Sequence, residues 1–168
     1  MSYQEKKTIV SIVSGALLLV AYCIYAFGRY NSGAIAQGDL KHWAGIMLIF
    51  IGIGIVLTIV IQIVFHILLS ISIAIKKKIQ DESLDDKEIE KSIQSEMVED
   101  EMDRLINLKS TQIGFIFAGI GFVTALVSLV LGYSPVVMLN ILFISFSAGS
   151  VLEGFTHLYF YRRGIQHG

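Results

Sequence analysis

The chain has 168 residues, of which 54% are hydrophobic, with a formal net charge of −1 and a mean hydropathy of +0.68. A composition this apolar leaves no room for a separate soluble catalytic domain, and a net charge near zero excludes a nucleic-acid-binding face of any size. With one cysteine, the chain cannot form a disulfide within the monomer.

Four apolar segments are long enough to cross a membrane, because a hydrocarbon core of roughly 30 Å requires about 20 helical residues. They are about Ile9–Phe27, Trp43–Ser70 (with a continuation as far as Ile75), Ile113–Leu131 and Val136–Tyr159. In lipid, each span must satisfy its own backbone hydrogen bonds. We therefore expect one all-α integral membrane domain over residues 1–168, a bundle of four transmembrane helices.

The first apolar segment follows the pair Lys6 and Lys7. Signal peptides begin in a similar way, but this apolar run is too long and no small-residue cleavage pattern follows it. We therefore expect the segment to be retained as the first transmembrane helix of the protein.

The second apolar segment carries a small or polar residue at every fourth position, at Gly54, Thr58, Gln62, His66 and Ser70. Residues four apart lie near one another on a helix surface. They form a slowly drifting polar stripe, which becomes more polar toward the end of the span that precedes the charged segment.

A charged segment, residues 76–110, separates the second and third spans. Between Asp81 and Ser110 it contains eleven acidic and four basic residues, a net charge of −7. Ser83 is a candidate helix start, and Ile89, Ile93 and Met97 recur at four-residue spacing, which predicts one or two amphipathic helices. Anionic head groups repel such a face. It is therefore expected to bind itself, a second subunit or a basic protein partner, unless it is only a solvated connector.

The end of this segment leads directly into the third span as Asp100-Glu101-Met102-Asp103-Arg104-Leu105-Ile106-Asn107-Leu108-Lys109-Ser110. This run resembles the juxtamembrane signature of a family of small uncharacterised prokaryotic multi-pass membrane proteins, written Asp-Glu-Arg-x-x-x-Ile-x-x-Lys-Ala before a pair of membrane helices. Asp100, Glu101, Ile106 and Lys109 match, whereas Met102 and Ser110 replace the usual arginine and alanine. Because many members are encoded beside helix-turn-helix regulators, the resemblance implies a sensory or regulatory role. The residues expected to dock a partner are Glu99, Asp100, Glu101, Asp103 and Arg104.

The third span contains a seam of small residues at alternating spacings of four and three: Gly114, Ala118, Gly121, Ala125, Ser128 and Gly132. Small residues let helix backbones approach closely in lipid, where burial of apolar surface cannot drive association. The heptad period predicts a left-handed crossing with another helix, within the chain or in a second subunit.

The fourth span contains the one acidic residue found inside any predicted span, Glu153, with His157 one turn further on. An ionised carboxylate at this position costs about 2.5–3.5 kcal/mol or more, so such residues usually face the bundle interior and have a partner. Glu153 is expected either to form a polar site with His66, Gln62, His157 and Thr58, or to be solvated or paired near the inner interface.

Histidines His66 and His157 lie on different spans near the same predicted membrane face. Two such imidazoles are the minimum for bis-histidine haem ligation. No Cys-x-x-Cys-His motif and no His-x-x-x-His pair supports a haem or metal site. We therefore expect no cofactor and no metal, with polar packing as the main role of these residues.

Orientation follows from the basic residues outside the spans. With both termini in the cytoplasm, eleven lysines and arginines lie inside and two, Arg29 and Lys41, lie outside. Cytoplasmic loops of membrane proteins carry such an excess. The sequence thus predicts a multi-pass protein of the cell membrane with both termini cytoplasmic.

Nothing in the sequence matches a nucleotide, zinc or nucleophile motif, and we expect the protein not to be an enzyme. Two functions remain. The first is a regulatory or interaction membrane protein whose acidic segment docks a cytoplasmic partner. The second is a small transporter or channel, expected to be a homo-oligomer, that binds a proton or cation at Glu153 with His66 and Gln62.

Overall fold

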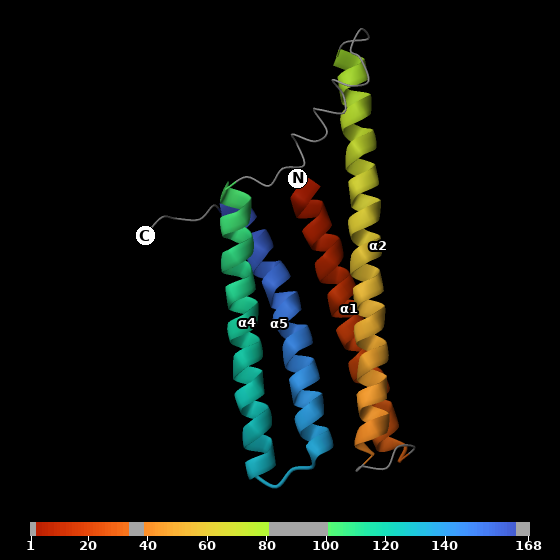
Figure 1. Cartoon of the computed structure of the whole chain (residues 1–168), viewed down its shortest axis with the longest axis vertical. Coiled ribbons are helices and arrows are strands. Elements are labelled where there is room, and N and C mark those ends of the chain that lie inside the picture. Colours follow the sequence, from red (N-terminus) through yellow and green to blue (C-terminus); the bar gives the residue numbers. More distant parts are fainter. Residues whose placement is uncertain (1–2, 34–38, 81–100, 164–168) are drawn as a thin grey trace.

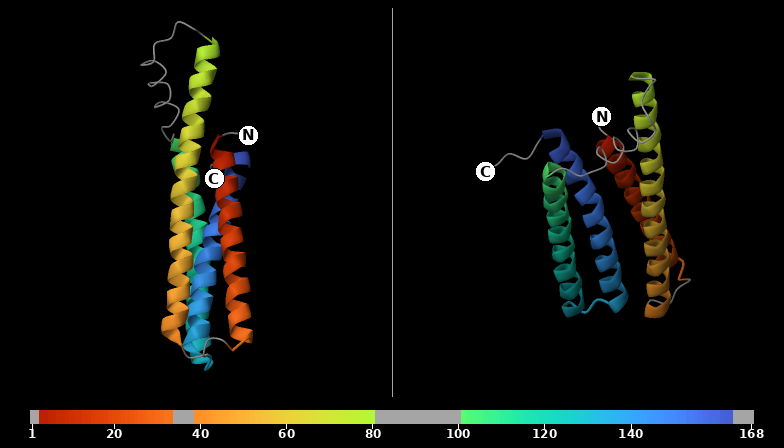
Figure 2. Two further views of the ribbon diagram at one scale, coloured as in Figure 1. Left: turned by 90° about the vertical axis from the view of Figure 1, so that its right-hand side faces the viewer. Right: turned by 45° about the horizontal axis from the view of Figure 1, so that its top comes forward.

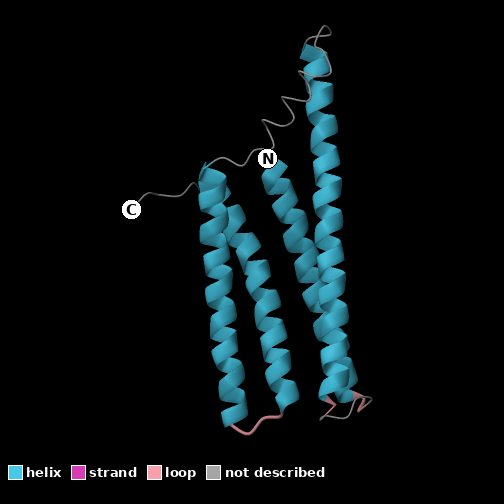
Figure 3. Ribbon diagram, in the orientation of Figure 1, coloured by secondary structure: helices cyan, strands magenta, loops and turns pink. Residues whose placement is uncertain are grey.

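The computed structural model describes residues 3–33, 39–80 and 101–163. Over these ranges the chain forms four helices and no strand: α1 (Tyr3–Asn31), α2 (Leu40–Gln80), α4 (Glu101–Val130) and α5 (Pro135–Arg163) (Figure 3). All four are long and apolar enough to cross a membrane. The predicted all-α fold with four candidate spans is confirmed. The amphipathic helix expected around Ile89–Met97 lies outside the described residues.

Capping groups fix where three of the helices begin or end. The Asp39 carboxylate accepts a hydrogen bond from the backbone N–H of His42 at 3.0 Å and caps the start of α2. Pro135 is the first residue of α5, where its missing N–H costs no hydrogen bond. After α4, Gly132 adopts φ 84°, and Tyr133 N–H donates to the Ser128 carbonyl at 3.0 Å. This is the Schellman ending, which favours glycine.

The helices lie in the order α4, α5, α1, α2, so that α5 is central and α2 and α4 are at the edges (Figure 1). α4 packs along α5, α1 packs against both α5 and α2, and α2 contacts α5 only over a short stretch; among the described residues α2 does not contact α4. We call the end with the starts of α1 and α4 the termini end. The opposite end, with the α4–α5 turn, is the hairpin end; Figure 2 shows both ends from two further directions.

The small-residue seam of α4 packs against α5. Its first five members are buried, and the row extends upstream through Ser110 and Ile106. A Cβ placed on Gly121 would lie 2.0 Å from Cβ of Ser145, and one on Gly149 would lie 2.8 Å from the carbonyl oxygen of Gly114. The two backbones are therefore too close for a larger side chain at these points. The sixth member, Gly132, is exposed beyond the helix end.

An aromatic cluster joins α1, α2 and α5 near the hairpin end. It contains Tyr22, Ala26, Trp43, Ile46, Met47 and Val136. Tyr22 is 0% exposed and Trp43 is 2% exposed. Both rings are therefore buried inside the bundle. The Tyr22 hydroxyl donates to the Asn140 side-chain oxygen at 2.7 Å, which links α1 to α5.

Helix α2 is longer than a single span requires. Its 41 residues correspond to about 61 Å at 1.5 Å per residue, roughly twice the hydrocarbon thickness. Figure 1 shows α2 extending past the other helices at the termini end. Most side chains of its second half, from Ile55 onward, are exposed. α2 is thus held mainly by the aromatic cluster near its beginning.

Candidate functional site

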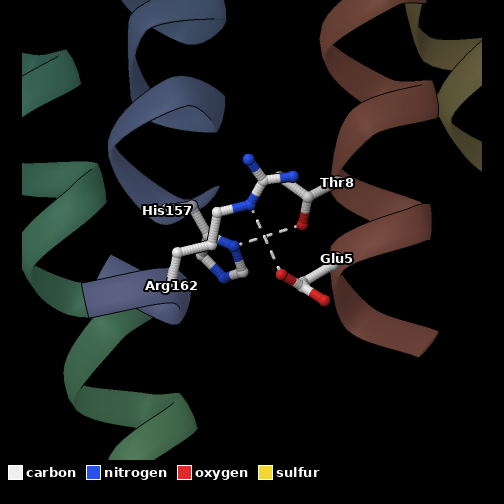
Figure 4. Close-up of polar contacts among 4 residues, drawn as sticks. All are labelled: Glu5, Thr8, His157 and Arg162. Atoms are coloured by element: carbon white, nitrogen blue, oxygen red, sulfur yellow. Dashed lines mark hydrogen bonds and ion pairs between the residues drawn. The ribbon is translucent and has the colours of Figure 1, made fainter. Parts of the chain in front are cut away.

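Polar side chains gather between the helices at the termini end, beginning with two contacts that join α1 to α5. The Thr8 hydroxyl lies 3.1 Å from Nδ1 of His157 (Figure 4). Close by, Nε of Arg162 lies 3.6 Å from a carboxylate oxygen of Glu5. The Arg162 side chain is 56% exposed, so this ion pair contributes at most about 1 kcal/mol to stability.

Two further contacts join α4 to α5 at the same end. The Thr111 hydroxyl donates a hydrogen bond of 2.6 Å to the Glu153 carboxylate, and the Tyr161 hydroxyl donates to the Asp103 carboxylate. Within the part of the chain that the structure describes, no basic side chain forms an ion pair with Glu153. One neutral donor therefore offsets only part of the cost of placing this carboxylate in an apolar span.

Several of these side chains line a cleft of about 380 Å³, which we call the polar cleft. Its volume falls within the range of known ligand sites. Contributions come from all four helices, so the cleft depends on the whole described bundle. The lining residues are Lys7, Thr8, Ser11, Gln62, Asp103, Asn107, Ser150, Glu153, Gly154, His157 and Tyr161.

A second and larger cavity of about 840 Å³ lies between α1, α2 and α5 and extends toward the hairpin end. We call it the apolar groove, because aliphatic and phenylalanine side chains supply most of its wall. Its polar members lie mainly toward the polar cleft, and three residues line both cavities: Ser11, Gln62 and Ser150. The two cavities are therefore adjacent and share part of their walls.

The polar stripe of α2 divides between these cavities and the outside. Gly54 and Thr58 line the apolar groove, and Gln62 lines both cavities. His66 is exposed and lines neither, so the structure does not bring it to Glu153 as expected. Two physical causes combine. Positions four apart drift around a helix of 3.6 residues per turn, and most side chains of α2 from Ile55 onward are exposed.

No metal or haem arrangement forms in the described residues. They contain no cluster of three histidine, cysteine or acidic side chains arranged to hold a metal ion. His157 lies in the polar cleft against Thr8, whereas His66 is exposed on α2 outside that cleft. The two imidazoles are therefore not placed as a pair of axial ligands.

The candidate docking residues lie at and before the start of α4. Glu101 and Arg104 are exposed in its first turn. Asp103 is half-buried and accepts the Tyr161 hydrogen bond, so it takes part in the contact between α4 and α5. Glu99 and Asp100 lie outside the described residues.

The polar partners Thr8, Thr111 and Asn140 were not singled out by the sequence. Threonine in an apolar span usually bonds to its own helix backbone, as Thr58 does with Gly54 at 2.9 Å. Asn140 carried a usable signal, because it is the one asparagine inside a predicted span. No family model, curated protein or solved structure matches the chain, and its function must be inferred from its own charges, cavities and helix contacts.

Proposed function

We propose that the protein is a non-enzymatic regulatory or interaction protein of the cell membrane. In this proposal both termini and residues 76–110 are cytoplasmic, and the acidic part of that segment binds a basic region of a cytoplasmic protein. The resemblance of residues 100–110 to a juxtamembrane signature of small membrane proteins favours the same role.

The observation that carries the proposal is the position of the two helix ends that flank the acidic segment. α2 ends at Gln80 beyond the other helices, and α4 begins at Glu101 at the same end of the bundle (Figure 1). Nine acidic and two basic residues lie between these ends. A net charge of −7 carried on one side of a membrane attracts a basic partner and accelerates its association.

Charge reversal tests this proposal. Lysine at Glu99, Asp100 and Glu101 should abolish co-purification of a partner from native membranes in mild detergent, because attraction becomes repulsion. Amide substitutions at the same three positions remove the charges with little change of shape, and should weaken recovery less than reversal does. Equal recovery with all three forms would exclude docking through this segment.

Asp103 is left out of the reversal because its contact with Tyr161 supports the α4–α5 pair. Asp103→Asn serves as the matched control, since an amide still accepts the tyrosine hydrogen bond while its charge is lost. It should keep the native elution volume in detergent. A shift to aggregate would mean that charge at this position matters for folding rather than for docking.

A second candidate function, proton or cation transport, is favoured by the Glu153 carboxylate in the polar cleft, which lies next to the apolar groove. Glu153→Gln should then eliminate ion-driven flux in proteoliposomes. His66→Ala should leave the flux intact, because His66 lies outside the polar cleft. Equal flux in wild type and Glu153→Gln would remove this carboxylate from any transport mechanism.

A further inference from the structure

The polar cleft and the apolar groove together have the shape and chemistry of one amphiphilic site. The cleft contains charged and amide side chains at the termini end, and the groove contains aliphatic and aromatic ones toward the hairpin end. From Glu153 to Leu139, both on α5, is about 21 Å at 1.5 Å per residue. A polar head and one extended alkyl chain match this division.

We infer that the two adjacent cavities bind a single-chain amphiphile with an ammonium head, the head at Glu153 and the alkyl chain along α1, α2 and α5. The sign of the head charge follows from the two carboxylates that line the cleft, Asp103 and Glu153, against one lysine, Lys7. Glu153 has a threonine hydroxyl but no ion-pair partner within the described residues. An ammonium group next to it would supply the missing counter-charge. Gln62 and Ser150, which line both cavities, offer further oxygen atoms with partial negative charge to such a head.

The bundle itself explains why the groove accepts a chain from the membrane. α2 is held by the aromatic cluster near its start and makes few contacts with α5 further along. A gap bounded by apolar side chains therefore remains beside α5 at the depth of the hydrocarbon core. An alkyl chain in this gap gains van der Waals contact that a rigid polar ligand would not. The inference does not depend on partner docking by the acidic segment.

A single tryptophan makes the site measurable. Trp43 is the one tryptophan in the chain, and it packs in the aromatic cluster with Met47, which also lines the apolar groove. The probe is hexadecyltrimethylammonium with bromine on its terminal carbon, added to the full chain in phosphatidylcholine nanodiscs. A seated probe would place its bromine near Met47, the groove residue that packs with Trp43, and quench the indole fluorescence. Because Trp43 is 2% exposed, bromine in the surrounding lipid reaches it poorly.

The expected result is saturable quenching by the cation and none by the equally brominated hexadecyl sulfate. Glu153→Gln should raise the half-saturating concentration about tenfold, equivalent to about 1.4 kcal/mol. Ser150→Leu adds bulk to the wall shared by the two cavities without changing charge, and should weaken binding too. Thr124→Val is the matched control, because Thr124 is exposed on α4 and lines neither cavity.

Three outcomes would overturn the inference. Equal quenching by both probes would mean that bulk lipid chains fill the groove without selection for the head. Absence of quenching by either probe would mean that a second copy or a side chain occupies it. Wild-type affinity in both Glu153→Gln and Ser150→Leu would place the probe elsewhere. If Glu153→Gln fails to fold, Ser150→Leu decides, and the charge-reversed docking variant should retain full quenching in any case.

Discussion

Gly121 shows how little space separates α4 from α5. A methyl group there would overlap Ser145, whose Cβ would lie 2.0 Å away. We predict that Gly121→Ala lowers the free energy of unfolding by about 1–3 kcal/mol, the usual cost of overpacking. The measurement is denaturation by sodium dodecyl sulfate in mixed micelles, followed by circular dichroism.

Gly119 provides the control two residues away. A Cβ at Gly119 meets nothing within 4 Å, so Gly119→Ala should not destabilise the protein. Ser145→Gly introduced into the Gly121→Ala variant should restore part of the lost stability, because it removes the atom that clashes. Equal stability of the two alanine variants would contradict the packing described for this helix pair.

Individual residues could be identified from the sequence where a charged group inside an apolar span costs free energy. They could not be identified where their role depends on how two helices are rotated and placed relative to each other. Glu153 stood out because a carboxylate within an apolar span needs a partner. The partner itself, Thr111, could not be identified, since threonine is common in spans and the relative rotation of α4 and α5 is not encoded locally. The His66 expectation assumed that α2 follows the bundle along its whole length, which it does not.

The contact between α1 and α5 is the main link between the first and second halves of the chain. Gly154 lies against α1, where an added Cβ would come within 2.5 Å of Cγ1 of Ile12. We predict that residues 1–90 and 91–168, co-expressed as separate chains, co-purify in detergent through this contact. Gly154→Leu should reduce recovery of the partner fragment by about 5- to 150-fold, through a steric cost of about 1–3 kcal/mol.

Gly119→Leu is the matched control, because it adds the same side chain to an exposed position of α4. It should leave recovery unchanged. Equal loss in both variants would mean that the fragments depend on helix insertion rather than on the α1–α5 contact.

The four helices follow directly from segment length and hydropathy. α4 begins at Glu101, before the predicted span, because Met102, Leu105 and Ile106 keep the helical period into the span. Which helices pack against each other could not be predicted from the sequence. The small-residue seam of α4 indicated a tight crossing but was consistent with α5 or with a second subunit. The structure assigns the described seam to α5, so a homo-oligomer, which remains a prediction, would need another surface.

For the whole molecule, the clearest prediction concerns orientation. In a Cys23→Ser background, a cysteine at Lys41 should react with a membrane-impermeant maleimide on intact cells. A cysteine at Glu101 should react only after the cells are lysed. Both positions are exposed and lie at opposite ends of the bundle. We expect this labelling pattern because lysine and arginine are in excess at the termini end, and such residues are kept in the cytoplasm. The reverse pattern would exclude a cytoplasmic partner for the acidic segment.

The length of α2 gives the molecule a mechanical property. With Trp43 packed in the cluster and Gln80 at the far end, the helix forms an arm of about 56 Å at 1.5 Å per residue, so a tilt of about 5° at its base would displace its tip by about 5 Å. A force on the Gln80 end of α2 would also move the part of α2 that lines the apolar groove, and would widen or narrow this groove. A small rotation of α2 at the aromatic cluster would therefore be amplified along the helix without any hinge inside it.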